Sequence, residues 1–168
     1  MKEEIERKFE VKRIPFELLD SVKSAVIKQG YIILNLRQGK SIRLRKTDGK
    51  VFHFTIKTGS GMARPEFEVE FTEEQCNEFW PLTKRKRVRK IRYCIPYEDL
   101  TIELDIYQGS LKGMATAEIE FKSVKRGKSV AIPEWFGREV TGNSRYSNQN
   151  LAVRGIPRGY KFPNNHKR

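Results

Sequence analysis

Charged residues in this sequence recur as doublets two positions apart, and each doublet holds charges of one sign. Glu-x-Glu occurs four times, and Arg-x-Arg, Lys-x-Arg and Glu-x-Asp doublets accompany it. The acids are Glu4, Glu6, Glu66, Glu68, Glu70, Glu103, Asp105, Glu118 and Glu120, and the bases are Lys8, Arg43, Arg45, Lys57, Lys90 and Arg92. Carboxylates suit hard divalent ions such as Mg²⁺ or Mn²⁺, and Lys and Arg suit phosphate oxygens. If one surface gathers both sets, the expected chemistry is phosphoryl transfer.

The doublets lie in segments where polar and apolar residues alternate, which is the pattern of a β-strand with two different faces. The alternating segments are 3–11, 41–46, 51–57, 66–71, 88–93, 102–106 and 117–121, and an apolar stretch at 30–36 predicts one more strand. Turn signals at 38–40, 48–50 and 59–61 separate several of them. About eight strands are enough to close a small barrel.

The polar face of an alternating strand usually points to water. Surface strands have no reason, however, to sort acids and bases strand by strand. The sorting favours a mainly β (α+β) fold: a closed eight-stranded antiparallel barrel with its charges inside and helices packed on its apolar outside. Helices are expected at 16–28, after Thr72, where Thr72 and Gln75 form a capping box, and at 145–154.

The 168 residues suit a single domain, which we expect to cover 1–156, followed by a basic, loose tail at 157–168. The net charge of +13 implies an anionic partner. The sequence shows neither a signal-peptide pattern nor an apolar run long enough to span a membrane, so a cytoplasmic location without membrane contact is expected. The oligomeric state is left open.

The segment Glu4-Ile5-Glu6-Arg7-Lys8 resembles the Glu-x-Glu-x-Lys motif that opens the triphosphate tunnel metalloenzymes, the CYTH-domain family. Companion segments follow in the family's order up to about residue 153. They are 42–45 (Ile-Arg-Leu-Arg), 55–57 (Thr-Ile-Lys), 64–68 (Arg-Pro-Glu-Phe-Glu), 90–93 (Lys-Ile-Arg-Tyr), 103–105 (Glu-Leu-Asp), 118–121 (Glu-Ile-Glu-Phe) and 144–146 (Ser-Arg-Tyr). The chain is most similar to short bacterial members, which resemble inorganic tripolyphosphatases.

The resemblance implies a role for each matching residue. The expected metal ligands, for two Mg²⁺ or Mn²⁺ ions, are Glu4, Glu6, Glu118 and Glu120. The expected triphosphate-binding residues are Lys8, Arg43, Arg45, Lys57, Lys90, Arg92 and Arg145. Glu4 or Glu6 would orient or deprotonate the attacking water, and Tyr31 would position Lys8. Further acids expected to line the tunnel are Glu66, Glu68, Glu103 and Asp105.

The expected reaction is hydrolysis of inorganic triphosphate to pyrophosphate and phosphate. Thiamine triphosphate or a nucleoside triphosphate is an alternative substrate, and a class IV-type adenylate cyclase ranks lower. A non-enzymatic alternative is a basic module that binds RNA or polyphosphate on its outside, to which the run at 84–90 would contribute. The nine sorted acids argue against a pure polyanion binder, because such a module has no use for them.

Overall fold

The computed structural model describes residues 2–35, 40–57 and 63–164, without the side chains of residues 2–4, 33–35, 41, 57, 63 and 64. Nine strands, four α-helices and three short 3₁₀ helices are assigned to these ranges. In chain order they are β1 (Lys2–Val11), α1 (Phe16–Leu19), β2 (Lys23–Asn35), β3 (Lys40–Thr47), β4 (Val51–Lys57), β5 (Ala63–Phe71), α2 (Glu73–Phe79), η1 (Trp80–Thr83), β6 (Arg87–Tyr97), β7 (Leu100–Gln108), η2 (Gly109–Leu111), β8 (Ala115–Phe121), α3 (Val124–Ser129), β9 (Phe136–Glu139), η3 (Ser144–Tyr146) and α4 (Asn148–Arg154). None of the described helices is long and apolar enough to cross a membrane.

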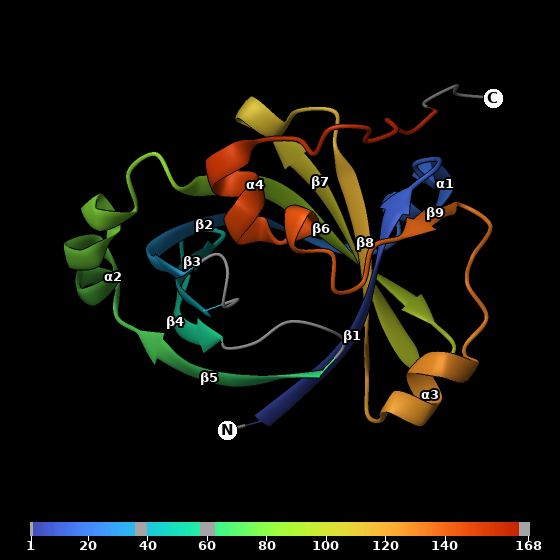
Figure 1. Cartoon of the computed structure of the whole chain (residues 1–168), viewed down its shortest axis with the longest axis horizontal. Coiled ribbons are helices and arrows are strands. Elements are labelled where there is room, and N and C mark those ends of the chain that lie inside the picture. The colour runs from blue at the N-terminus through green and yellow to red at the C-terminus, as the bar shows by residue number, and fades with distance from the viewer. Residues whose placement is uncertain (1, 36–39, 58–62, 165–168) are drawn as a thin grey trace.

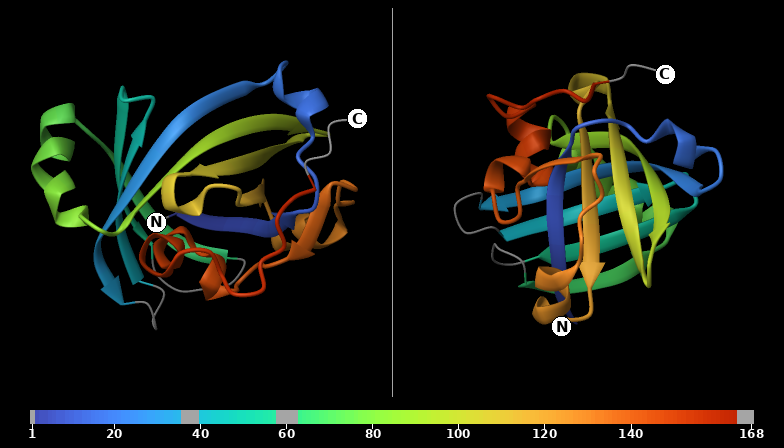
Figure 2. Two further views of the ribbon diagram at one scale, coloured as in Figure 1. Left: turned by 90° about the horizontal axis from the view of Figure 1, so that it is seen from above. Right: turned by 90° about the vertical axis from the view of Figure 1, so that its right-hand side faces the viewer.

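The strands form one antiparallel sheet in the order β5-β4-β3-β2-β6-β7-β8-β1-β9. β1 pairs with β8 along its middle and with β9 at its end, and its first residues, Lys2–Ile5, also pair with β5. The sheet is therefore strongly curled, as the two views of Figure 2 show. The short helices lie around it, with α2 beside β4 and β5 and α4 next to β6 (Figure 1).

The mainly β fold predicted from the alternation is confirmed as a curled antiparallel sheet, whereas its closure into a barrel is not shown. Two further features differ from the prediction. The curled sheet has nine strands rather than eight, because β9 adds to β1 beyond the last strand expected. The helix predicted at 16–28 is wrong: α1 ends at Leu19, and Lys23 already begins the long strand β2.

The faces of the sheet differ in kind. The main apolar core lies on one face of β1, β7 and β8, where Phe9, Leu104 and Ile119 pack with Trp135 and Phe136 from β9 and the segment before it. The residues between these apolar positions carry the charged doublets and lie on the opposite face, which we call the charged face. Each of these strands thus packs in the apolar core with one face and presents charged side chains on the other.

A second apolar cluster lies at one end of the charged face. Val88 and Tyr107, which belong to the charged face by alternation along β6 and β7, contact Tyr146 of η3 and Leu151 of α4. The helix predicted at 145–154 is therefore present as η3 and α4. The Thr72–Gln75 capping box at the start of α2 is also confirmed.

The sequence predicts a loose tail from Pro157 onward, but the described part of this segment packs on the domain. Tyr160 is buried in the second apolar cluster, and its hydroxyl donates to the carbonyl of Ala115 at 3.0 Å and accepts from the same residue's N–H at 2.9 Å. Asn164 N–H donates to the carbonyl of Lys12 at 2.9 Å. A buried aromatic ring with two backbone hydrogen bonds explains why this segment is held.

Candidate active site

Strand register places oppositely charged residues of the charged face side by side. Lys8 lies opposite Glu118 in the β1–β8 pair, and Arg92 lies opposite Asp105 in the β6–β7 pair. Glu103 of β7 is in turn opposite Glu118. Because β6, β7, β8 and β1 are consecutive in the sheet, these five side chains form one continuous polar network.

Lys8 is fixed at the β1 end of this network by Glu118. Its Nζ lies 2.8 Å from Glu118 Oε1, and both side chains are nearly buried. Burial alone would lower the pKa of Lys8, but the Glu118 carboxylate, together with Tyr107 and Glu6, outweighs burial and raises it. Burial would likewise raise the pKa of Glu118, but the charges of Lys8 and Arg92 hold it well below its usual range. Both residues are therefore ionised near neutral pH.

Asp105 links Lys90 and Arg92 at the centre of the charged face. Its side chain has no exposed surface and accepts hydrogen bonds from Arg92 Nε at 2.7 Å, from Arg92 Nη2 at 2.8 Å and from Lys90 Nζ. Arg92 also contacts Glu103 and lies 3.3 Å from Glu118. Burial, followed by the charge of Arg92, lowers the pKa of Lys90 to about 8, although the Asp105 charge acts in the opposite direction.

A second group of cations comes from β3, on the other side of β2. Arg43 Nη2 donates to Thr55 at 3.0 Å and to Glu68 at 3.1 Å. The Nε atoms of Arg43 and Arg45 are buried and have no hydrogen-bond partner among the described residues. Burial, followed by the charges of Arg43 and Arg92, lowers the pKa of Arg45 to about 10.

Charge effects between strands that are distant in the sheet indicate which face lies inside the curl. Lys8 of β1 affects the pKa of Tyr31 of β2, although β6, β7 and β8 lie between those two strands. Arg92 of β6 likewise acts on Arg45 of β3, and β2 lies between those strands in the sheet. Glu103 of β7 also acts on Arg45. The charged face is therefore the inside of the curl, where cations from different strands are concentrated around a common space.

The carboxylates predicted as metal ligands are only partly described. Glu6 lies directly opposite Glu120 in the β1–β8 pair, next to the Lys8–Glu118 pair. Glu4 lies opposite Arg64 in the β1–β5 pair, but its side chain is outside the described part. Within the described residues, no group of three or more His, Cys, Asp or Glu side chains is close enough to hold a metal ion.

The remaining predicted residues occupy several environments. The Tyr31 hydroxyl accepts a hydrogen bond from Gln29 Nε2 at 3.0 Å, and the Lys8 charge is near enough to affect the pKa of Tyr31, which burial raises. Arg145 is exposed on η3, and the side chain of Lys57 is outside the described part. Glu66 lies opposite Lys57 in the β4–β5 pair.

Three buried polar residues of the charged face were missed in the sequence. Gln29 contacts Tyr31, and the Tyr107 hydroxyl lies 3.4 Å from Thr116 Oγ1 and donates to Asn148 Oδ1 at 2.7 Å. A usable signal was present, because Tyr107 continues the alternation of Glu103 and Asp105, and Thr116 precedes Glu118 by two positions. Residue charge alone does not reveal these positions, because all three side chains are neutral.

Comparisons with known proteins agree with this arrangement. The chain is 36% identical over 152 residues to an inorganic triphosphatase of Nitrosomonas europaea, covering 89% of this chain and 97% of that protein. It is 35% identical over 153 residues to an inorganic triphosphatase of Acetivibrio thermocellus, covering 90% and 94%. No family model matches the chain.

Solved structures show the same relationship. The crystal structure of an inorganic triphosphatase superposes with a TM-score of 0.66 at 32% identity, covering 98% of this chain and 99% of that one. A Hippeastrum protein with a dominant triphosphatase activity shares the fold, with a TM-score of 0.60 at 15% identity over 74% of this chain and 82% of its own. The identity and coverage of the curated relatives, together with the shared curled sheet, place this chain in the inorganic triphosphatase family.

Proposed function

We propose that this protein hydrolyses inorganic triphosphate to pyrophosphate and phosphate inside the curled sheet, with a divalent metal ion, Mg²⁺ or Mn²⁺. We further propose that the sheet closes around the substrate as an eight-stranded tunnel, with β9 outside it. The pairing of β1 with both β8 and β5 supports this closure.

The observation that carries the proposal is the concentration of cations around Arg45. Arg43 and Arg45 have buried Nε atoms without a partner among the described residues, and the charge of Arg92, two strands away in the sheet, also acts on Arg45. Bringing buried like charges together costs free energy unless an anion compensates them. A triphosphate supplies several negative oxygens in a compact chain, and guanidinium groups bind such oxygens in pairs.

The chemistry of the acids fits a hard divalent cation. Glu6 and Glu120 lie opposite each other on neighbouring strands, where two like charges destabilise a sheet. A cation held by their oxygens would relieve this repulsion. We propose that two metal ions are held by Glu6 and Glu120 together with Glu4 and Glu118, and that the metal, when bound, neutralises charge on the phosphate oxygens.

The protein's own groups would bind and align the substrate. We propose that Arg43, Arg45, Lys90 and Arg92 bind phosphate oxygens from the inside of the curl. Lys57 and Arg145 would bind the substrate as well. Lys8 is kept charged and oriented by Glu118, which fits a cation that must meet the transferred phosphoryl group in one position.

Two roles concern the attacking water and the orientation of Lys8. We propose that Glu4 or Glu6 orients or deprotonates the water and that Tyr31 positions Lys8. The effect of the Lys8 charge on the pKa of Tyr31 supports their proximity. Glu66, Glu68, Glu103 and Asp105 would hold the cations in place, as the contacts of Glu68 with Arg43 and of Asp105 with Arg92 illustrate.

The test is phosphate release from inorganic triphosphate, thiamine triphosphate, ATP and long-chain polyphosphate, each with Mg²⁺, with Mn²⁺ and with chelator. We expect the highest kcat/KM with inorganic triphosphate, pyrophosphate as the second product, and loss of turnover with chelator. Faster turnover of ATP or thiamine triphosphate would reassign the substrate. Binding of polyphosphate or RNA without any turnover would overturn the enzymatic proposal.

A further inference from the structure

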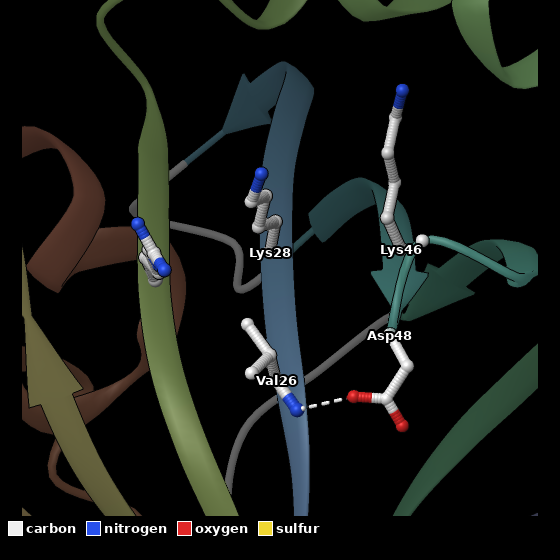
Figure 3. A pocket seen from close by; sticks show the side chains of 6 residues that line it. Val26, Lys28, Lys46 and Asp48 are labelled. Carbon is white, nitrogen blue, oxygen red and sulfur yellow. Dashed lines mark hydrogen bonds between the residues drawn. The ribbon is translucent and has the colours of Figure 1, made fainter.

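A pocket of about 320 Å³ lies on the outer face of the sheet, outside the curl (Figure 3). Its lining comes from β2, β3, the β3–β4 turn and β6, and consists of Val26, Lys28, Lys46, Asp48, Gly49 and Arg89. By alternation, Lys28, Lys46 and Arg89 point away from the charged face, which Gln29, Arg45 and Lys90 occupy on the same strands. The pocket is therefore separate from the proposed active site, although only the thickness of one sheet divides them.

The three cations of the pocket form a row across three neighbouring strands. Lys28 lies opposite Lys46 in the β2–β3 pair and opposite Arg89 in the β2–β6 pair. Neighbouring strands are about 4.8 Å apart, so the row spans about 10 Å. Like charges directly opposite each other destabilise a sheet. Figure 3 shows Lys28 and Lys46 extending in the same direction from their strands.

The protein compensates this row only weakly. The one acid of the lining, Asp48, uses Oδ1 to accept the Val26 N–H at 2.7 Å. Lys46 donates to Asn77 at 2.6 Å and lies over the ring of Trp80. No hydrogen bond or ion pair joins the side chain of Lys28 or Arg89 to another residue in the described ranges.

The lining favours an inorganic anion over a nucleic acid. Proteins that bind single-stranded nucleic acids stack the bases on aromatic side chains, and the lining contains none. The nearest large ring, Trp80, is already occupied, since Lys46 Nζ and the Arg87 guanidinium each lie 4.7 Å from its centroid. A row of cations without an apolar platform recognises charge density alone.

We propose that this pocket is a second anion site that binds a linear inorganic polyphosphate, separately from the site of hydrolysis. A chain of several linked phosphates carries many charges along its length, so it can contact more than one cation of the row at the same time. The pocket needs no metal ion for this, because it contributes three positive groups against one carboxylate. The site would hold the anion on the molecule without reaction, so the proposal does not depend on turnover.

The test is a titration of the ¹⁵N-labelled full chain with inorganic tripolyphosphate, in chelator to prevent turnover, followed by amide chemical shifts. The amides of Val26 and Gly49 report the outer pocket, and that of Gln29 reports the charged face. We expect saturable shifts at the pocket amides. In Lys28→Gln/Arg89→Gln, the dissociation constant read from these amides should rise ~10-fold or more, because a lost hydrogen bond to a charged group has about this effect.

The matched control is Lys112→Gln/Lys125→Gln, which removes the same charge from exposed positions outside the pocket. It should change the dissociation constant less than ~2-fold, since scattered surface charges act only through the screened field. An equal rise of the dissociation constant in both double variants would overturn the proposal, because binding would then depend on the net charge of the protein and not on the pocket. Absence of shifts at Val26 and Gly49 would overturn it as well.

A second arm identifies the ligand. A ten-nucleotide pyrimidine RNA should shift the pocket amides only at higher concentration than tripolyphosphate; tighter RNA binding would overturn the assignment to inorganic polyphosphate. Steady-state hydrolysis by the Lys28→Gln/Arg89→Gln variant should keep the parent's kcat. If the parent protein does not hydrolyse triphosphate, the result counts against the proposed function only. If the pocket amides do not shift, the result counts against this inference only.

Discussion

Removing the charge of Asp105 should destabilise the protein by ~3–5 kcal/mol, the usual cost of breaking a buried ion pair from one side. Asp105 is fully buried and accepts two hydrogen bonds from Arg92 and one from Lys90. Each charge-assisted bond contributes about 1.5–3 kcal/mol. Part of that sum is offset because the carboxylate is removed from water. Asp105→Asn keeps the shape but leaves two buried cations with a neutral partner.

The measurement is urea unfolding followed by the fluorescence of Trp80 and Trp135. With a slope of about 2 kcal/mol per molar urea, the midpoint should fall by ~1.5–2.5 M. The control is Glu103→Gln, which also removes a carboxylate bound to Arg92, but one whose side chain is 39% exposed. We expect the control to cost less than ~1 kcal/mol. Equal losses in the two variants, or a loss below ~1 kcal/mol in Asp105→Asn, would refute the reasoning.

Three further predictions concern the metal, the substrate and the packing. Glu120→Gln should lower kcat by ~10²–10³ while the variant stays folded, because it removes a charge from the proposed metal site; near-parental kcat at saturating Mg²⁺ would contradict the assignment. Because the pKa of Lys90 is lowered to about 8, its positive charge is lost above that pH. The kcat/KM for triphosphate should therefore fall above about pH 8, and a profile unchanged in Lys90→Met would show that another group titrates. Gly30→Ala should cost ~1–3 kcal/mol in urea unfolding, because the new Cβ would lie 2.5 Å from the Thr83 side chain; full parental stability would show that Thr83 can move aside.

The charged strands were predictable because two patterns agree in each of them. Polar and apolar residues alternate, and the polar positions carry doublets of charges of one sign. In β7, Glu103 and Asp105 alternate with Ile102 and Leu104, and the structure puts the acids on one face and the apolar pair in the core. Alternation alone gives no sign of which face is inside. The sorting of charge by strand supplied that information, and the contact of Arg92 with Asp105 agrees with it.

The error at 16–28 has a physical cause. Leu19, Val22 and Val26 fit a helical stripe, but Val26 and Ile27 are also β-branched, and such residues favour strands. Pairing with neighbouring strands makes this segment a strand, because β2 lies between β3 and β6 in the sheet. A short apolar segment is ambiguous between helix and strand when its neighbours in space are unknown.

β9 and the outer pocket could not be predicted for a different reason. β9 is only four residues long and is defined by its pairing with β1 rather than by its own pattern. The row of Lys46, Lys28 and Arg89 depends on the register of three strands, one of which, β6, is far from β2 and β3 in the sequence. The sequence suggests a role for Arg89 only as part of the basic run at 84–90, because its neighbours on β2 and β3 cannot be identified from the sequence.

The position of β1 in the sheet also has a consequence for how the protein is made. β1 is synthesised before the other strands of this sheet, yet most of its partners lie in β8 and β9, which come last among them. Pairings between residues far apart in sequence form slowly, because the long intervening loop must first be ordered. Until β8 arrives, β1 has an open edge that invites aggregation. Glu6 meets Glu120 only in this late step. The proposed metal site would thus be among the last parts of the molecule to assemble, and a chain that ends before β8 would lack it.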